Sequence, residues 1–348
     1  MTDYPKVSLI DQDGLLSVPD CWEALTPKTY LALVAALTAF CTGKMSPMEV
    51  KAEYVRYALT DSGHAPRTPD DLCNIIALAA KVTFPFRISY DNEELLADLK
   101  PEERALMHRV DPNRLDTPIA RAIARKGAYH YTLNNCFCAQ LLPSIDVDGQ
   151  QYRGYAISTD YGMLSTNMTA LQYLDARSLM TNPDTLPLLA AVLYCPGTYY
   201  DPETAHRTAH SMEHLDPITL SAIQLCFQAF DNYLLTRTHF SILQDSGNSA
   251  PRKTPLISTG PVEALYSLAS SGYGSLEQVE QMNVVKYLTL MRKQLIDSIH
   301  AMKDSGMKVT EIATKSGLSF TTINKILLCK KPFRGACISY TNNQSRIT

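Results

Sequence analysis

Apolar side chains recur every three or four residues along much of this chain, a pattern that predicts a mainly helical protein. The first such segment follows Thr26 and Pro27, a pair suited to a helix N-cap and first turn. Ser46 and Pro47 open a second segment in the same way. Further helices are predicted over residues 69–81, 166–180, 186–194, 216–235 and 262–270.

The main β signal is the stretch CFCAQLLPSIDVDGQQYRGYAIST, residues 136–159. It is typical of strands joined at Asp148-Gly149, a dipeptide that favours a tight hairpin turn. In a strand, Cys136 and Cys138 would lie on one face as small buried hydrophobes. The predicted fold class is therefore mainly α, with a helical body, a small β-hairpin element and a C-terminal tri-helical helix-turn-helix.

A stretch dense in Gly, Ser and Pro, residues 244–261, has the composition of a linker. It divides the chain into a helical body over residues 1–243 and a basic helical domain over residues 262–348. In that domain, apolar positions from 288 to 302 predict a helix whose apolar face must pack against other parts of the protein, and the helix is expected to end near Gly306.

Charge is distributed unevenly between these two parts. From residue 286 onward there are 11 Lys and Arg against 3 Asp and Glu, a net charge of +8. The preceding residues carry 21 against 32, or −11, so the total of −3 conceals a basic C-terminal domain on an acidic body. A basic face of this kind favours nucleic acid as a partner.

The sequence VTEIATKSGLSFTTINKIL, residues 309–327, predicts two short helices joined by a tight turn, within a helix-turn-helix over residues 308–328. Ala313 is small where a second helix must cross, and Gly317 stands where the chain reverses. Ser319 can cap the second helix, while Ile323 and Ile326 line its inner face.

On these residues the stretch resembles the helix-turn-helix of the lac-repressor family, and IHAMKDSGMKVTEIATKSGLSFTTINKIL resembles the C-terminal DNA-binding domain of serine resolvases and invertases. The resemblance implies that exposed residues early in the second helix face base edges. These are Ser319, Phe320, Thr321 and Thr322, followed by Asn324 and Lys325.

Two interpretations of this unit stay open. In the first, basic side chains neutralise DNA phosphates, and these include Lys308, Lys315, Lys325, Lys330 and Lys331. In the second, the three helices form a folding or protein-docking element, and its lysines are a solvated face. Lys308 also stands where a Ser or Thr cap is usual, which weakens the start of the first helix.

Two other groups of residues have a metal-binding and a structural interpretation. His206, His210 and His214 are spaced so that neighbours lie one turn apart, as in some metal sites, but the third lies about 80° around the helix from the first. A surface histidine stripe is favoured. Asp146 and Asp148 hint at a calcium loop, but the positions that follow lack the expected ligands and the hairpin turn accounts for them.

No nucleotide-binding, hydrolase or zinc motif is present, and the nine cysteines show no CxxC spacing. The absence of these motifs does not exclude an enzyme, because active sites are assembled in space from distant residues. No residue of the sequence is identified as catalytic. We therefore predict a non-enzymatic protein without metal or cofactor. No segment has the length and apolar character of a membrane span or signal peptide, so a cytoplasmic location without membrane association is expected.

The order VPDCWEALTPKTYL, VTFPFRI, a hairpin, TNMTALQYLDA and LPLLAAVLYCPGTYYD resembles uncharacterised proteins encoded by phages and prophages, some of them candidate tail-assembly chaperones. The predicted function is therefore that of a phage-type protein that binds double-stranded DNA through its C-terminal helix-turn-helix. The alternative is a tail-assembly chaperone or morphogenesis adaptor whose C-terminal bundle docks a phage structural protein. Homo-oligomerisation is expected, because paired modules gain specificity.

Overall fold

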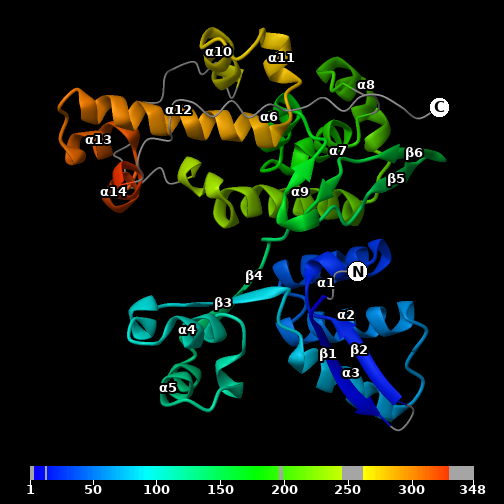
Figure 1. Cartoon of the computed structure of the whole chain (residues 1–348). Helices are drawn as coiled ribbons and strands as arrows, with labels where there is room; N and C mark the ends of the chain where they lie inside the picture. The colour runs from blue at the N-terminus through cyan, green and yellow to red at the C-terminus, as the bar shows by residue number, and fades with distance from the viewer. Residues whose placement is uncertain (1–3, 12–13, 196–198, 245–261, 329–348) are drawn as a thin grey trace.

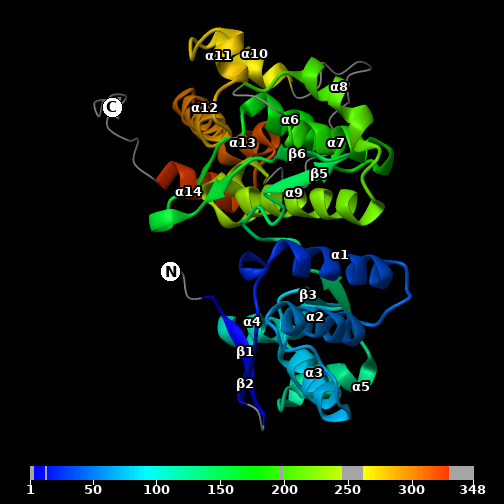
Figure 2. The same cartoon turned by 90° about the vertical axis from the view of Figure 1, so that its right-hand side faces the viewer.

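A computed structural model describes residues 4–11, 14–195, 199–244 and 262–328. These residues form a mainly α-helical protein with small two-stranded antiparallel sheets, as the sequence predicts. Figures 1 and 2 show two tiers, a lower tier over residues up to 133 and an upper tier that follows it. Within the described residues, no helix combines the length and the apolar character that crossing a bilayer requires.

The lower tier begins with a β-hairpin that the apolar pattern did not predict. Its strands are β1 (Lys6–Asp11) and β2 (Gly14–Pro19), and three helices follow: α1 (Pro27–Cys41), α2 (Pro47–Asp61) and α3 (Pro69–Lys81). The predicted starts are confirmed, because Thr26 and Ser46 accept hydrogen bonds from backbone N–H groups of the first turns of α1 and α2.

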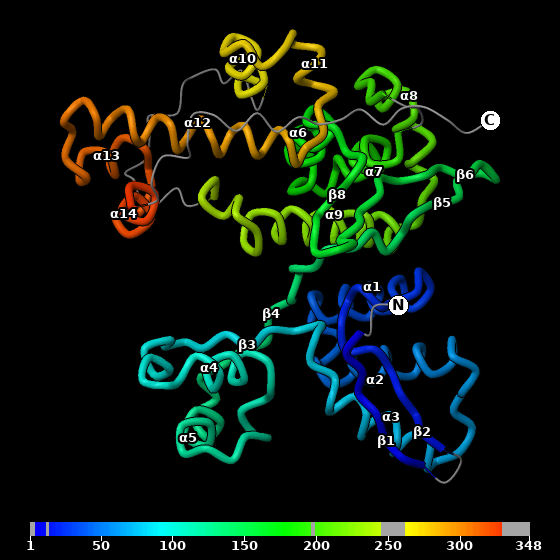
Figure 3. Tube along the Cα trace, in the orientation of Figure 1, coloured from blue at the N-terminus to red at the C-terminus, as the bar shows by residue number. Residues whose placement is uncertain are grey.

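A small lobe completes the lower tier beside α1–α3, as Figures 1 and 3 show. It contains β3 (Phe86–Tyr90), η2 (Glu93–Leu96), α4 (Pro101–Met107), η3 (Pro112–Arg114), α5 (Pro118–Lys126) and β4 (Tyr129–Leu133). β3 and β4 pair antiparallel, with Ile88 opposite Tyr131. The lobe has its own small core, which includes Ile88, Leu96 and Ile123.

The upper tier starts with short strands and continues with helices. These are β5 (Ser144–Val147), β6 (Gln150–Arg153), β7 (Ile157–Ser158), η4 (Asp160–Gly162), β8 (Ser165–Thr166), α6 (Ala170–Leu179), η5 (Pro183–Thr185), α7 (Leu186–Leu193), α8 (Pro202–Met212), α9 (Pro217–Arg237) and η6 (His239–Leu243). The predicted hairpin turn is confirmed: Asp148 and Gly149 have φ of 52° and 80° between β5 and β6, the conformation of a type I′ turn.

The expectation that Cys136 and Cys138 lie in a strand is wrong. The chain between β4 and β5 has no strand, and the backbone N–H of Cys138 donates to the Glu23 carboxylate at 3.3 Å instead of to a neighbouring strand. Cys138 is buried, while Cys136 is half-buried with its Sγ 3.6 Å from Thr236 Oγ1. The packing of Cys138 as a small hydrophobe therefore does not depend on β structure.

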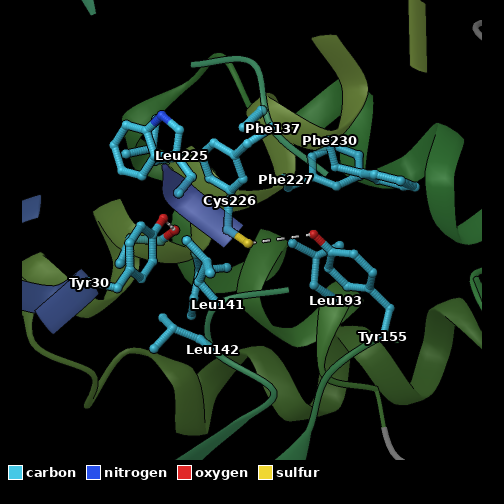
Figure 4. Packing of buried hydrophobic residues seen from close by; sticks show 14 of the residues in the cluster. Tyr30, Phe137, Leu141, Leu142, Tyr155, Leu193, Leu225, Cys226, Phe227 and Phe230 are labelled. Carbon is cyan, nitrogen blue, oxygen red and sulfur yellow. Dashed lines mark hydrogen bonds between the residues drawn. The ribbon is translucent and has the colours of Figure 1, made fainter. Parts of the chain in front are cut away.

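One large core joins the two tiers through the contact of α1 with α9. Figure 4 shows its centre, where Cys226 lies among aromatic and leucine side chains and approaches Tyr155. The hydroxyl of Tyr30 on α1 donates to the carbonyl of Ala222 on α9 at 2.8 Å. This bond satisfies a buried polar group, which would otherwise cost free energy.

The C-terminal helices are α10 (Val262–Ser270), α11 (Leu276–Glu280), α12 (Val284–Asp304), α13 (Val309–Ser316) and α14 (Phe320–Leu328). Leu265 and Leu268 of α10 and Tyr287 of α12 belong to the same core as the body. The predicted linker lies outside the described residues from 245 to 261. The two parts that it separates in sequence therefore share one core, and the separate core of the C-terminal helices begins only along α12.

Candidate nucleic-acid interface

The second half of α12 packs with α13 and α14 into what we call the three-helix unit, residues 295–328. Its core consists of five buried side chains: Ile299, Ile312, Leu318, Ile323 and Ile326. The unit lies at the end of α12 that is farthest from α6, as Figure 1 shows. α12 ends at the predicted place, because Gly306 takes a left-handed conformation with φ of 86° just beyond it.

The turn between α13 and α14 spans the three residues 317–319. Gly317 has φ of 73°, a conformation that costs glycine little. Leu318 is buried in the core of the unit, and Ser319 Oγ accepts the backbone N–H of Thr322 at 3.1 Å. Each of these residues has the local role that its position in the sequence predicts.

The start of α13 lacks a side-chain cap, as the lysine at this position predicts. Lys308 makes no capping bond with its side chain, but its backbone N–H donates to the Glu311 carboxylate at 3.3 Å. A carboxylate in the first turn also interacts favourably with the positive end of the helix dipole. Glu311 thus stabilises the helix end that Lys308 leaves uncapped.

The outer face of α14 lies opposite its two buried isoleucines. Helical geometry places its five residues, Phe320, Thr321, Asn324, Lys325 and Leu328, within an arc of about 140°. Thr321 and Lys325 are exposed, as is 53% of Phe320, whereas Asn324 is half-buried. Leu328, which is 81% exposed, also lies on this face and was not among the predicted site residues.

Two predicted base-facing residues are engaged within the helix itself. Ser319 and Thr322 are half-buried, and their hydroxyl oxygens lie 2.9 Å apart. Because Ser319 Oγ also caps α14, these hydroxyls stabilise the helix start. Thr321, Asn324 and Lys325 therefore remain as the polar side chains of the outer face.

The basic residues predicted to contact phosphate lie at different places around the unit. Lys308 and Lys315 are exposed at the two ends of α13, and Lys325 is exposed on α14. Lys330 and Lys331 lie outside the described residues. α14 carries no acidic side chain, so Lys325 makes its outer face positive.

The rings of His210 on α8 and His214 just after it lie 6.2 Å apart, but each histidine pairs with a different carboxylate. His210 lies 3.3 Å from Glu213, whereas His214 Nδ1 lies 2.5 Å from the Asp148 carboxylate at the β5–β6 turn. Asp146 Oδ1 accepts the backbone N–H of Gly149 at 3.0 Å within that turn. In the part of the chain that the structure describes, no group of three or more His, Cys, Asp or Glu is arranged to hold a metal ion.

Comparisons extend over protein-family models, curated proteins and solved structures. None of these comparisons gives a significant match to the chain. The function of α13, α14 and their three-residue turn is therefore inferred from their own residues.

Proposed function

We propose that this chain is a non-enzymatic protein of the phage or prophage type that binds double-stranded DNA through α13 and α14. One observation carries the proposal: a three-residue turn joins two short helices, and the second presents Thr321, Asn324 and Lys325 opposite its buried face. A helix held in this way can enter the major groove while the first helix crosses the DNA backbone.

The outer face of α14 has chemistry that suits base edges. An asparagine such as Asn324 can pair with adenine, a lysine such as Lys325 with guanine, and a threonine hydroxyl with either. Phe320, half exposed beside them, suits contact with a thymine methyl group. Lys308 and Lys315 would contact phosphates, which position the protein without reading sequence. A dimer would pair two such helices at a spacing of one DNA turn.

The test is the affinity of the full chain for mixed-sequence duplex DNA, measured by fluorescence anisotropy over a range of salt concentrations. We expect log Kobs to fall with log salt by roughly 0.9 for each phosphate neutralised. The triple variant Thr321→Ala, Asn324→Ala, Lys325→Ala should bind more weakly at low salt, and its salt slope should be shallower by roughly 0.9, since it removes one positive charge that would contact phosphate on mixed-sequence DNA.

The matched control is Lys126→Ala, which removes the same charge from exposed α5 in the lower tier. It should leave DNA affinity unchanged, and circular dichroism should show that both variants stay folded. If the triple variant binds DNA as tightly as the unchanged chain at every salt concentration, the proposal is wrong.

A protein-docking role, as in a tail-assembly chaperone or morphogenesis adaptor, is the second candidate. Its support is the apolar exposure at both ends of the outer face, at Phe320 and Leu328. Under this alternative the chain would show no DNA affinity even at low salt. A co-purifying phage structural protein would then be lost in the double variant Phe320→Ser, Leu328→Ser.

A further inference from the structure

The lower tier contains a hollow of about 340 Å³ that we call the Lys51 pocket. Its lining comes from the start of α2, the end of α3, the chain between α4 and η3, and Tyr131 of β4. These segments are far apart in sequence, so the pocket exists only where the small lobe packs against α2 and α3. Its size lies at the lower end of the range for small-molecule sites.

Lys51 is the unusual residue of this pocket. Its side chain is only 9% exposed, although it lines the hollow, and its Nζ lies 5.8 Å from the centre of the Tyr131 ring. Among the described residues, no acceptor forms a hydrogen bond with Nζ and no carboxylate lies within ion-pair distance. Burial lowers the pKa of Lys51, while the negative charges of Asp111 and Asp20 act in the opposite direction.

The two carboxylates near Lys51 are already engaged by other donors. Asp111 accepts hydrogen bonds from the hydroxyls of Tyr131 at 2.7 Å and Tyr129 at 3.3 Å. Asp20 accepts the backbone N–H of Thr83 at 2.7 Å and its hydroxyl at 2.9 Å. Neither carboxylate therefore pairs directly with the Lys51 ammonium, which lines the hollow at the end of a largely buried residue.

Three more cations line the same pocket: Lys81, Arg109 and Arg114. Lys81 Nζ donates to the carbonyl of Ser8 at 2.8 Å, and Arg109 donates to Thr83 Oγ1 at 3.2 Å. Arg114 is exposed at the rim. Since Asp111 is the single acidic residue in the lining, the pocket has a clear excess of positive charge.

The remaining lining is apolar and gives the pocket a second kind of surface. Met48 of α2, Val82 after α3 and Val110 after α4 contribute aliphatic groups, and Tyr131 contributes its ring. Convergent cations beside apolar walls fit a molecule that has an anionic group and a compact apolar body. A phosphate group suits the cations better than a carboxylate, because it carries more charge and offers three acceptor oxygens.

We propose that the Lys51 pocket binds a small organic phosphate, whose phosphate group pairs with Lys51 and Arg114 and whose apolar part lies against Met48, Val110 and Tyr131. This site is separate from the outer face of α14 and does not depend on DNA binding, because every residue that lines it belongs to the lower tier.

The test uses isothermal titration calorimetry on the full chain with phenyl phosphate, inorganic phosphate and phenol. Phenyl phosphate should bind with a stoichiometry of one, inorganic phosphate more weakly, and phenol not measurably. Lys51→Met, which removes the charge but keeps most of the unbranched side chain, should weaken phenyl phosphate binding at least tenfold. The matched control Lys44→Met removes an exposed lysine just before α2 and should keep the affinity of the unchanged chain.

Thermal unfolding without ligand provides a second readout. Lys51→Met should not lower the melting midpoint, because it replaces a partly desolvated ammonium that has no close carboxylate with an apolar group. Arg114→Gln, at an exposed position, should weaken binding severalfold without moving the midpoint, and it carries the test if Lys51→Met does not fold. The proposal is overturned if neither phosphate binds, or if the Lys51 and Lys44 variants show equal affinities.

Discussion

The core of the body and the core of the three-helix unit are built from contacts of different range. In the body, the Tyr30 hydroxyl bonds a carbonyl 192 residues away, and Trp22 Nε1 donates to the Asn134 carbonyl 112 residues away. In the three-helix unit, all five buried side chains lie between Ile299 and Ile326. The body thus depends on contacts between distant segments, whereas the three-helix unit is built from neighbouring ones.

Helix α12 belongs to both cores and connects them. Tyr287 and Leu288 near its start pack with the body, while Ile299 near its end is buried in the three-helix unit. The buried Tyr173 hydroxyl of α6 donates to Asp231 of α9 at 2.5 Å, next to this first half of α12. One continuous helix passes through both cores. Because the body core is larger and the three-helix unit has only five buried side chains, we expect the three-helix unit to be the less stable of the two.

The largest expected effect is in the body, at Phe227. This side chain is fully buried and makes edge contacts with the rings of Tyr155 and Tyr173. Phe227→Ala should lower the free energy of unfolding by about 3–5 kcal/mol, since it leaves a cavity and removes aromatic contacts. Urea denaturation followed by circular dichroism measures this loss.

Tyr161, which is 97% exposed, provides the control for Phe227. Tyr161→Ala should leave the midpoint of urea unfolding nearly unchanged, because surface substitutions have small effects. Similar midpoints for the two variants would contradict the assignment of the main stability to the body core.

A smaller and more local effect is expected at Ile323 in the three-helix unit. Ile323→Ala should destabilise α13 and α14 by about 2–5 kcal/mol, while α6, α7 and α9 keep their structure. Hydrogen exchange measured by mass spectrometry should show faster exchange in residues 309–328 alone. Leu328→Ala, at an exposed position of the same helix, is the control.

Equal acceleration of exchange in α9 and in α14 would show that the two cores unfold together. The body and the three-helix unit would then form one cooperative unfolding unit, although their side chains pack in separate cores.

The smallest expected effect concerns the surface pair His214 and Asp148, which ties the end of α8 to the β5–β6 turn. The hydrogen bond and negative charge of Asp148 raise the pKa of His214 above its ordinary value of 6.5. Because the folded pKa is raised, the stabilisation is fully present below pH 6.5 and is lost as pH rises through the raised value.

An NMR titration of the His214 ring measures this effect. In Asp148→Asn the pKa of His214 should fall toward its ordinary value. An unchanged pKa of His214 in this variant would exclude the ion pair in solution.

Much of the helical structure was predictable because its signals act over a few residues. The caps at Thr26 and Ser46, the turn at Asp148-Gly149 and the left-handed Gly317 all have the predicted local structure. Helical spacing also predicts which side chains of α14 face outward. Only the packing of the turn showed that Ser319 and Thr322 are engaged with each other.

The small lobe shows where this approach fails. Its helices α4 and α5 are short and each carries three charged side chains, so few apolar positions recur along them. β3 pairs with β4, which follows about forty residues later, and no local signal specifies that pairing. The same holds for the shared core, since the packing of Leu265 against the body is decided across the predicted linker.

By itself, the sequence determined the helical class of this protein, most helix starts, the hairpin turn and the arrangement of α13 and α14. These features depend on hydrogen bonds and spacing within one or two turns of chain. The tertiary structure alone decided that α10 and α12 join the body core and that Lys51 is buried among other cations. Burial and charge proximity result from contacts between distant segments, and no local pattern of residues encodes them.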